Sequence, residues 1–357
     1  MAKNILLLFG GVSGEHEVSC VSAKFIEKTL IEAKYQVIPV YINTEGNWHY
    51  QSRVPDNPEK HEINPCFLHR HSDCQIQTTD NKFPVDFAFP IIHGTTGEDG
   101  KLQGFFEFVD IPYAGSDVLS SALCMNKYYS KLIFQSAHIP QVSFIKVEKH
   151  EWTKFPEKII NNIAKDFRFP VFTKPASMGS SVGISRVQNP ENLNEAIEHA
   201  LKFDDLVMCE QGISAREIEV SILGNFPDYK VSIPGEIISS HDFYSYEAKY
   251  LDTNGARLVI PAEISPDQSM TIQELAVKSF TSVQGCGFAR IDFFLNKEDN
   301  HIYLNEINTL PGFTPVSMFP KLWEQSGLKS VDLIHKIIQL GVEKYKQKKT
   351  LKTRRNG

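Results

Sequence analysis

Residues 287–317 read GFARIDFFLNKEDNHIYLNEINTLPGFTPVS, and this stretch decides the fold. Its first part, ARIDFFL, alternates with period two, which predicts a strand with Arg290, Asp292 and Phe294 on one face and aliphatic or aromatic residues on the other. The turn-rich NKEDNH that follows predicts a hairpin centred near Asp299. A core strand would be apolar, so the charges here need an explanation.

The second strand of this hairpin is HIYLNEIN, in which we expect four side chains to share a face: Ile302, Leu304, Glu306 and Asn308. The hairpin would place Asp292 opposite Glu306, so two carboxylates, one carboxamide and one arginine would crowd one sheet face. Like charges this close need a cation between them, and ligands that are all oxygen favour Mg²⁺ over Ca²⁺. The alternative is an ordinary exposed sheet face with weak surface ion pairs.

The bulk composition is that of a globular protein. The chain has 357 residues, 41% hydrophobic and 22% charged, which predicts two or three domains. Its net charge of −6 argues against a nucleic-acid partner. The six scattered cysteines form no disulfide framework and favour a reducing cytoplasm. Because no apolar run is long enough to span a bilayer, we expect a soluble, intracellular protein without a membrane partner.

The chain begins with a βαβ pattern, which predicts a parallel sheet. The apolar run Ile5–Phe9 is followed by a glycine-rich loop, a helical pattern and a second strand over 35–41. The loop lacks the spacing of a dinucleotide fingerprint because Val12 stands in place of a glycine, so a dehydrogenase is disfavoured. Glu15 in this loop is either a partner of the helix dipole or an anchor for a ligand amine.

Residues 51–82 are polar and irregular. They contain Cys66, His69, His71 and Cys74, whose spacing resembles a zinc site. Structural zinc sites usually consist of two tighter pairs on ordered turns, so a surface insertion is the preferred interpretation.

The middle of the N-terminal half continues the α/β pattern. Residues 85–92 predict a buried strand, and the polar glycine-rich loop 93–100 follows at its carboxyl end, where α/β proteins bind ligands. Residues 120–137 predict one helix that carries Lys127 and Lys131. Lysines on a helix are usually solvated, so their spacing alone indicates no function.

A small-residue loop next to a lysine predicts a phosphate-binding hairpin. In FPVFTKPASMGSSVGISRV, Val171–Lys174 is a strand, 178–183 is the loop, and 183–187 is a strand again. Backbone N–H groups of such a loop can surround phosphate oxygens, and Lys174 can supply charge. The alternative is an ordinary mobile turn.

Two strands further on predict a wall for a nucleotide. Leu206–Glu210 is apolar and ends in an acid, and the strand within 212–223 places Glu217 and Glu219 on one face. Apolar residues would contact an adenine and an acid would bind ribose hydroxyls; a solvated strand face is the alternative. Residues 239–261 are too polar for a core and too aromatic for a linker, which suits a lid.

The C-terminal end of the chain contains a helix and a basic tail. Residues 328–344 predict an amphipathic helix, and KYKQKKTLKTRRNG after it is expected to be disordered and solubilising.

Seven segments in this order resemble the ATP-grasp ligases, and within them the D-alanine–D-alanine ligase family: GGVSGEHEVS, HGTTGEDGKLQG, MNKYYSK, TKPASMGSSVGIS, FYSYEAKY, GFARIDFF and NEINTLPGFTPVSMFP. The resemblance covers nearly the whole chain up to about residue 340. It implies an α/β, three-domain ATP-grasp fold, with an N-terminal Rossmann-like parallel sheet followed by two α+β subdomains that hold ATP between antiparallel sheets. The boundaries we expect are 1–122, 123–212, 213–345 with the lid at 239–261, and a basic tail at 346–357.

The resemblance also implies roles for individual residues. Magnesium would be bound by Asp292, Glu306 and Asn308. ATP would be bound by Lys127, Lys174, Ser180, Ser181, Val182, Gly183, Glu210, Gln211, Ile213, Glu217 and Lys249. The substrates would be bound by Glu15, His93, Arg290, Gly312, Ser317 and Met318. The catalytic set would be Glu15 with its partners Ser180 and Tyr250, the oxyanion site of Arg290 and the Gly312 N–H, and Ser317.

The implied reaction joins two D-alanines through a D-alanyl phosphate and releases ADP and phosphate, for peptidoglycan synthesis in the cytoplasm. It implies ATP, two Mg²⁺ (or Mn²⁺) and a homodimer. A D-alanine–D-lactate or D-alanine–D-serine ligase is one alternative, which Tyr250 in the lid disfavours. A non-catalytic nucleotide or amino-acid sensor is another, which is disfavoured because a binder does not need the oxyanion arginine, Arg290.

Overall fold

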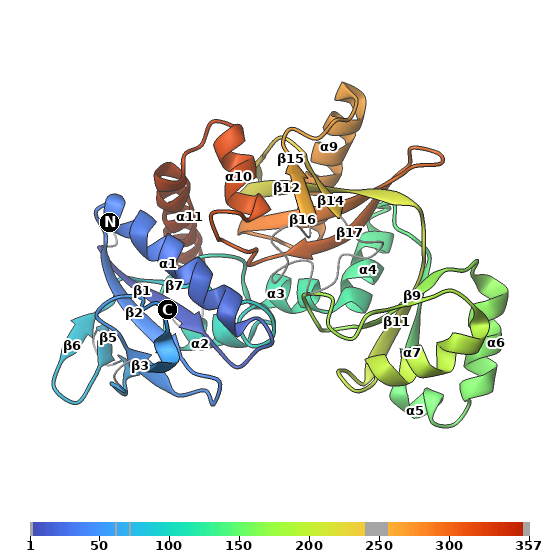
Figure 1. The fold of residues 1–357 in the computed structure, drawn as a ribbon. Coiled ribbons are helices and arrows are strands. Elements are labelled where there is room, and N and C mark those ends of the chain that lie inside the picture. The colour runs from blue at the N-terminus through green and yellow to red at the C-terminus, as the bar shows by residue number, and fades with distance from the viewer. Residues whose placement is uncertain (1–2, 61–62, 71–72, 240–255, 353–357) are drawn as a thin grey trace.

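The computed structural model describes residues 3–60, 63–70, 73–239 and 256–352. Within them the strands form four sheets, arranged with the N-terminal sheet at one end and the sheet that contains β9 (Val171–Pro175) and β11 (Leu206–Gln211) at the other (Figure 1). Three residues named above, His71, Lys249 and Tyr250, lie outside the described residues. No described helix is both long enough and apolar enough to cross a bilayer.

The N-terminal sheet confirms the predicted βαβ unit. Its central strand β1 pairs in parallel with both β2 and β7, and α1 (His16–Glu32) packs Ala23, Ile26 and Leu30 against it without exposure to solvent. Unbroken apolar runs form these strands because both faces of the sheet are covered. The strand order is β3 (Trp48–Tyr50), β2 (Gln36–Ile42), β1 (Asn4–Gly10), β7 (Phe87–Pro90).

The prediction that residues 51–82 are irregular is wrong. The segment contains a 3-10 turn (Pro58–Lys60) and most of an antiparallel three-stranded sheet: β4 (Phe67–Arg70), β5 (Cys74–Gln77) and β6 (Lys82–Pro84). Cys66 and Cys74 are buried in the same apolar cluster as Ile76, under the N-terminal sheet. Burial raises the pKa of the Cys66 thiol to about 12, which disfavours the thiolate that zinc binds. The sequence did not reveal β4, β5 and β6 because these strands are short and show no clear alternation of apolar and polar residues.

The single helix predicted over 120–137 is two helices. After α2 (Lys101–Phe108), α3 spans Val118–Met125 and α4 spans Lys127–Ser136. The break is at Asn126, whose extended backbone ends α3 and whose side chain accepts a 3.1 Å hydrogen bond from the Tyr129 N–H to cap α4. Lys127 therefore stands at a helix start, turned toward the loop that follows β9.

A second lobe is built on an antiparallel sheet, as the hairpin at 171–187 predicts. Helices α5, α6 and α7 supply apolar residues, including Trp152, Ile163 and Ile197, to the core on this sheet. The strand order is β10 (Ser185–Val187), β9 (Val171–Pro175), β11 (Leu206–Gln211), β8 (Phe144–Glu148). The helices are α5 (Lys149–Trp152), α6 (Pro156–Asp166) and α7 (Leu193–Ala200), the last preceded by a 3-10 turn (Pro190–Asn192).

The opening hairpin lies in the largest sheet, whose core is covered by α9 (Pro266–Ser282) and α4. Helix α9 begins with a capping box between Ser265 and Gln268. The strand order is β15 (Ala256–Val259), β14 (Gly235–Ser239), β12 (Ala215–Asn225), β16 (Gly287–Asn296), β17 (Ile302–Asn308), with β13 (Asp228–Val231) paired to β12.

The two ends of the chain share one core. Helices α10 (Met318–Gln325) and α11 (Ser330–Lys349) pack Phe319, Ile334 and Ile337 into the cluster that contains Ile5 and Phe9 of β1. This shared core fixes the last sheet against the first.

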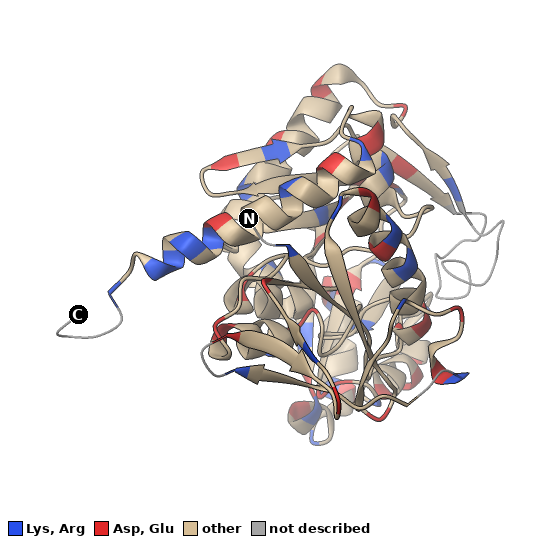
Figure 2. Cartoon of the chain, turned by 90° about the vertical axis from the view of Figure 1, so that its left-hand side faces the viewer, with Lys and Arg blue, Asp and Glu red and all other residues tan. Residues whose placement is uncertain are grey.

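Helix α11 runs beyond its expected end at residue 344. Lys348 and Lys349 form ion pairs of 2.6 and 2.5 Å with Glu107 and Asp110 at the end of α2. The expectation of disorder from residue 344 is therefore wrong up to residue 349. Figure 2 shows the basic residues gathered along this end of α11.

Candidate active site

One large cavity, about 2080 Å³, is lined by strands of the two large antiparallel sheets and by segments that follow β1 and β7 of the N-terminal sheet. Its walls come from the loop after β1, the loop between β9 and β10, strands β11, β12, β16 and β17, and the loop before α10. Segments more than 200 residues apart in the sequence, such as Glu15 and Glu306, line the same space. A cavity of this size can hold a nucleotide together with small substrates.

The β16–β17 hairpin has the predicted register. Asp292 lies opposite Glu306, and Arg290 lies opposite Asn308. Arg290 donates two 2.7 Å hydrogen bonds to the Asp292 carboxylate and its Nε lies 3.1 Å from Glu219 Oε2, while Asn308 Nδ2 donates to Asp292 at 2.9 Å. Burial alone would lower the pKa of Arg290, but Asp292 and Glu219 outweigh burial and raise it well above the usual value. The guanidinium is therefore charged at any working pH.

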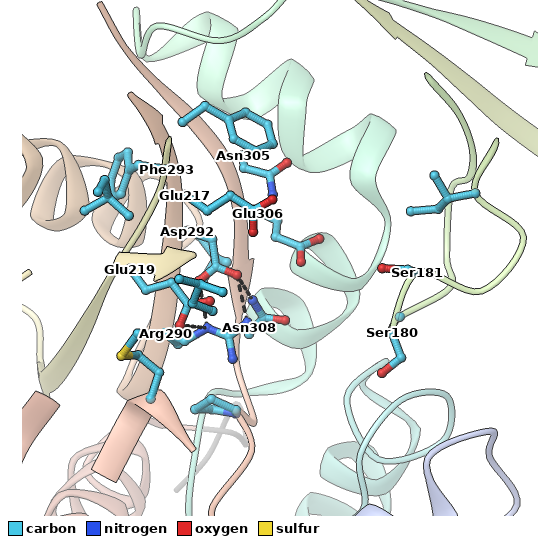
Figure 3. A pocket seen from close by; sticks show the side chains of 18 of the residues that line it. Ser180, Ser181, Glu217, Glu219, Arg290, Asp292, Phe293, Asn305, Glu306 and Asn308 are labelled. Carbon is cyan, nitrogen blue, oxygen red and sulfur yellow. Dashed lines mark hydrogen bonds and ion pairs between the residues drawn. The ribbon is translucent and has the colours of Figure 1, made fainter. Parts of the chain in front are cut away.

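The prediction that Ile302 and Leu304 share a face with Glu306 and Asn308 is wrong. The pairing register between β16 and β17 shifts between Asp292 and Phe293, because Asn305 is the extra residue of a bulge in β17. Leu304 is fully buried in the core under the sheet, whereas Asn305 and Glu306 line the cavity (Figure 3). A bulge moves every side chain beyond it to the other face, so Leu304 packs into the core while Glu306 and Asn308 face the cavity.

The donor set at this hairpin suits a hard divalent cation. Asp292 and Glu306 offer carboxylate oxygens, and Asn308 offers its side-chain carbonyl oxygen. The Asn308 Nδ2 is not available as a ligand because it donates a hydrogen bond to Asp292. Among the described residues no three His, Cys, Asp or Glu side chains meet closely enough to form a complete metal site by themselves. Mg²⁺ is commonly held by one or two carboxylates together with substrate phosphates, so these residues fit it once a nucleotide completes the shell.

The loop between β9 and β10 faces this hairpin across the cavity (Figure 3). Ser180 and Ser181 have φ of 50° and 60°, which is uncommon for residues other than glycine and marks a constrained loop. Lys127 at the start of α4 donates a 2.6 Å hydrogen bond to the Met178 carbonyl and lies 3.6 Å from Glu306. Lys127 thus connects the loop with the acidic hairpin.

The loop also reaches Glu15, as the resemblance implies. The Ser180 hydroxyl donates a hydrogen bond to the Glu15 carboxylate. Gly94 and Gly179 pack so tightly around this carboxylate that a Cβ on either would lie 2.6 or 3.0 Å from Glu15 Oε2. Gly94 also has φ +76°, so two features require glycine there.

His93 lines the cavity in the predicted first-substrate region, and its side chain is almost fully buried. Its ring contacts the Leu310 carbonyl at 3.1 Å and the Ser22 hydroxyl at 3.0 Å. Burial lowers its pKa, but the hydrogen bond and charge of Glu98 outweigh burial and raise it. Glu98, which sequence reasoning missed, also accepts a 2.9 Å hydrogen bond from the Gly94 N–H. The sequence could have indicated Glu98, because it lies five residues after His93 in the same glycine-rich loop.

Lys131 is the clearest residue that the sequence reasoning misjudged. It is not solvated: its side chain is 2% exposed, and its Nζ lies 2.9 Å from Glu210 Oε1. Glu210 also accepts a hydrogen bond from Lys174, so its carboxylate lies between two ammonium groups. The sequence could have indicated this, because the four-residue spacing of Lys127 and Lys131 puts both on one face of the helix.

The remaining predicted residues divide into two groups. Those that line the cavity are Lys174, Ser181, Gln211, Ile213, Glu217, Gly312, Ser317 and Met318. Val182 and Gly183 do not. Gly183 has a packing role, because a Cβ there would meet Phe203 and Pro175 at 2.6 and 2.7 Å. The Ser317 hydroxyl accepts a 3.0 Å hydrogen bond from the Thr314 N–H, which shapes the turn around Gly312.

Comparisons with known proteins agree with this geometry. The family model "D-ala D-ala ligase N-terminus" matches residues 4–116, and "D-ala D-ala ligase C-terminus" matches residues 133–339. The chain is 44% identical to the D-alanine–D-alanine ligase of Caldicellulosiruptor bescii, over 99% of each chain.

Solved structures give the same result. The D-alanine-D-alanine ligase from Coxiella burnetii is similar with a TM-score of 0.87 and 33% identity, over 98% of this chain and 96% of that one. The VanG D-Ala:D-Ser ligase from Enterococcus faecalis is similar with a TM-score of 0.85 and 32% identity, over 96% and 100%. The fold is therefore shared by ligases that differ in their second substrate.

Proposed function

The chain belongs to the D-alanine–D-alanine ligase family, and from this we propose that its cavity joins two D-alanines at the expense of ATP, through a D-alanyl phosphate, to give D-alanyl-D-alanine, ADP and phosphate. One observation carries the proposal: the Glu15 carboxylate, the constrained loop that holds Ser180 and Ser181 (the serine loop) and the acidic β16–β17 hairpin line a single cavity. A carboxylate is a poor electrophile, so a reaction that forms an amide from it needs both an activating phosphate and a place to hold the amine.

The nucleotide would lie between the antiparallel sheets. Ser180 to Gly183, Lys127 and Lys174 would bind its phosphates, while Gln211, Ile213 and Glu217 would form the wall for the base and ribose, with Glu210 behind Lys174. Support for this comes from Lys127, which contacts the loop from α4, from Lys174, which lines the cavity from β9, and from the left-handed backbone at Ser180 and Ser181.

Asp292, Glu306 and Asn308 would hold magnesium, which when bound neutralises the crowded phosphate oxygens. We propose two ions, with Glu306 shared between them. The support is the set of oxygen donors on adjacent strands and the position of Glu306 between Asp292 and Lys127. Mn²⁺ would fit the same donors.

Glu15 would bind the ammonium of the first D-alanine, with His93 behind that subsite. Ser180 orients the Glu15 carboxylate through its hydrogen bond. Water would hydrolyse an acyl phosphate, so we propose that residues 239–261, with Lys249 and Tyr250, close the site. These two residues lie outside the described part of the chain.

The second half-reaction needs donors for a tetrahedral oxyanion. Arg290 and the Gly312 N–H would supply them, and Ser317 with Met318 would receive the second D-alanine. The support is that Arg290 is held rigidly by Asp292 and Glu219 while it lines the cavity. Fixed donors are effective because they need no reorganisation during the reaction.

We propose the domain limits 1–122, 123–212 and 213–345. Each of these domains would contain one of the three large sheets around the cavity. We further propose a homodimer in the cytoplasm. The six free cysteines support a reducing compartment. Sedimentation velocity of the purified protein tests the dimer, since a monomer at micromolar concentration would contradict it.

The test of the activity is a competition assay. Purified protein receives ATP, Mg²⁺ and D-alanine alone, or with D-serine or D-lactate, at neutral pH. We expect ADP release that depends on D-alanine, with the dipeptide D-alanyl-D-alanine as the main product. Predominant D-alanyl-D-lactate or D-alanyl-D-serine would overturn the second-substrate assignment, and absence of ADP release would favour a sensor.

A further inference from the structure

Helix α4 presents two lysines one turn apart, and only one of them has a place in the proposed function. Lys127 faces the serine loop and Glu306. Lys131 points instead at Glu210, with its Nζ 2.9 Å from Oε1 and 5.5 Å from the centre of the Phe144 ring. Its side chain is 2% exposed and does not line the cavity, so it cannot itself bind substrate.

Glu210 therefore has two counter-ions of different kinds. Lys174 contacts one carboxylate oxygen and lines the cavity; Lys131 contacts the other oxygen from behind the wall. Two ammonium groups on one buried carboxylate leave an excess positive charge next to the cavity. Excess charge in a buried place is unfavourable unless an anion balances it.

We propose that Lys131 is a positioning residue, a permanent counter-ion that keeps Glu210 ionised and paired when Lys174 turns from Glu210 to the nucleotide phosphates. The inference rests on the proposed function, because it takes Lys174 to be a phosphate ligand. It explains why a lysine occupies a position with no access to the substrate.

The need for Lys131 is seen from the charges that would remain without it. If Lys174 were the only partner of Glu210, its movement to a phosphate would leave a buried carboxylate unpaired. The carboxylate would then either hold Lys174 back, which weakens nucleotide binding, or take up a proton. With Lys131 present, Glu210 neither holds Lys174 back nor takes up a proton, because its ion pair with Lys131 remains when Lys174 moves to a phosphate.

The other groups around Glu210 do not replace Lys131. On β11 the neighbouring Cys209 is a buried thiol whose pKa burial raises to about 12, so it is neutral. Across the sheet Glu210 pairs with Phe144 of β8 and Phe172 of β9, which carry no charge. Glu306 on β17 is an acid whose charge acts on Lys131, so it is no counter-ion for a carboxylate. Lys131 and Lys174 are therefore the cations on Glu210 in the described structure.

The first experiment is a binding cycle with MgADP as the probe. Dissociation constants are measured by calorimetry for the full-length wild type, Lys131→Met, Glu210→Gln and the double variant. We expect Lys131→Met to weaken MgADP binding by about tenfold or more, and expect the double variant to bind within about threefold of Glu210→Gln, because a neutral glutamine side chain in place of Glu210 needs no counter-ion. KM for D-alanine should stay near wild type.

The second experiment measures protons. Calorimetry in buffers of different ionisation enthalpy at pH 6.5 gives the number of protons taken up with MgADP. Relative to wild type, Lys131→Met should take up on the order of one additional proton per nucleotide, and the double variant none. A role of Lys131 in packing alone would not change proton uptake, so equal uptake in wild type and Lys131→Met overturns the inference.

Further variants separate this inference from the proposed function. Lys174→Met should weaken MgADP binding strongly; wild-type affinity in that variant would contradict the phosphate role of Lys174. If Lys174→Met binds weakly but Lys131→Met binds like wild type, only the inference about Lys131 fails. If Lys131→Met does not fold, Lys131→Gln replaces it, and a gap of more than about tenfold between Glu210→Gln and the double variant would overturn the charge argument.

Discussion

The hydroxyl of Ser180 donates a hydrogen bond to the carboxylate of Glu15, between residues 165 positions apart in the sequence. The contact joins the loop that follows β9 to the start of α1, and so joins the proposed phosphate site to the proposed amine site. A constrained backbone at Ser180 and a tight glycine at Gly94 hold the two side chains in place. The loop that we propose binds the nucleotide phosphates therefore also orients the group that would bind the first amino acid.

Replacing Ser180 by Ala removes this hydrogen bond to a charged acceptor, which is worth about 1.5–3 kcal/mol. We expect KM for D-alanine at the first site to rise by about tenfold or more, while KM for ATP changes less. Initial rates with D-alanine varied at saturating ATP measure this. Ser181→Ala, in the same loop, is the comparison and should affect ATP more than D-alanine; equal effects of both variants on D-alanine would contradict the role of Ser180.

Glu306→Gln keeps the shape of the side chain but removes a charge from the proposed metal site. We expect kcat to fall by at least about 100-fold and the Mg²⁺ activation curve to move to higher concentration, with folding preserved. Rates over a Mg²⁺ titration test this. The control is Glu324→Gln on the exposed side of α10. Near-normal activity of Glu306→Gln at limiting Mg²⁺ would refute the bridging role.

Asn126 positions Lys127 by capping α4, and it also donates a 3.0 Å hydrogen bond to Ser177 beside the serine loop. We expect Asn126→Ala to lower the free energy of unfolding by about 1 kcal/mol and to raise KM for ATP. The matched control is Asp117→Ala, because Asp117 caps α3 through the Ser120 N–H but no phosphate lysine follows it. Denaturant unfolding and ATP kinetics should show equal losses of stability but a change in KM only for Asn126→Ala.

The buried acid Glu210 gives the fold a dependence on pH. Burial alone raises its pKa, but the charges of Lys131 and Lys174 outweigh burial and lower it from 4.5 to about 2. The unfolded chain therefore binds the proton more tightly, so this stabilisation is present above about pH 4.5 and is lost as the pH falls toward 2. Burial also lowers the pKa of Lys131, so the ion pairs offset a desolvation cost and do not add their full strength.

Denaturant unfolding between pH 5 and pH 2.5 checks this, with the double variant Lys131→Met/Glu210→Gln as the reference, since it removes a charge of each sign. The free energy of unfolding of the wild type should fall more steeply than that of the double variant, by on the order of 2 kcal/mol over the window. Parallel curves would contradict the ionised state of Glu210.

Local patterns were enough for much of the fold. Alternation in 287–308 predicted the hairpin and the pairing of Asp292 with Glu306, and the apolar run Ile5–Phe9 with its glycine loop predicted the βαβ unit. The small-residue loop after Lys174 predicted an antiparallel hairpin. Each of these depends on contacts between residues near in sequence, whose geometry is set by backbone period and turn chemistry.

The sequence by itself thus determined the main strands around the site, the order of the motifs and the types of donor that the site uses. Only the tertiary structure decided which side chains meet. It placed Ser180 on Glu15, moved Leu304 into the core through the bulge at Asn305, and buried Lys131 against Glu210. The physical reason is that burial and charge pairing depend on neighbours from distant segments, and a lysine on a helix looks the same in sequence whether it faces water or a buried carboxylate.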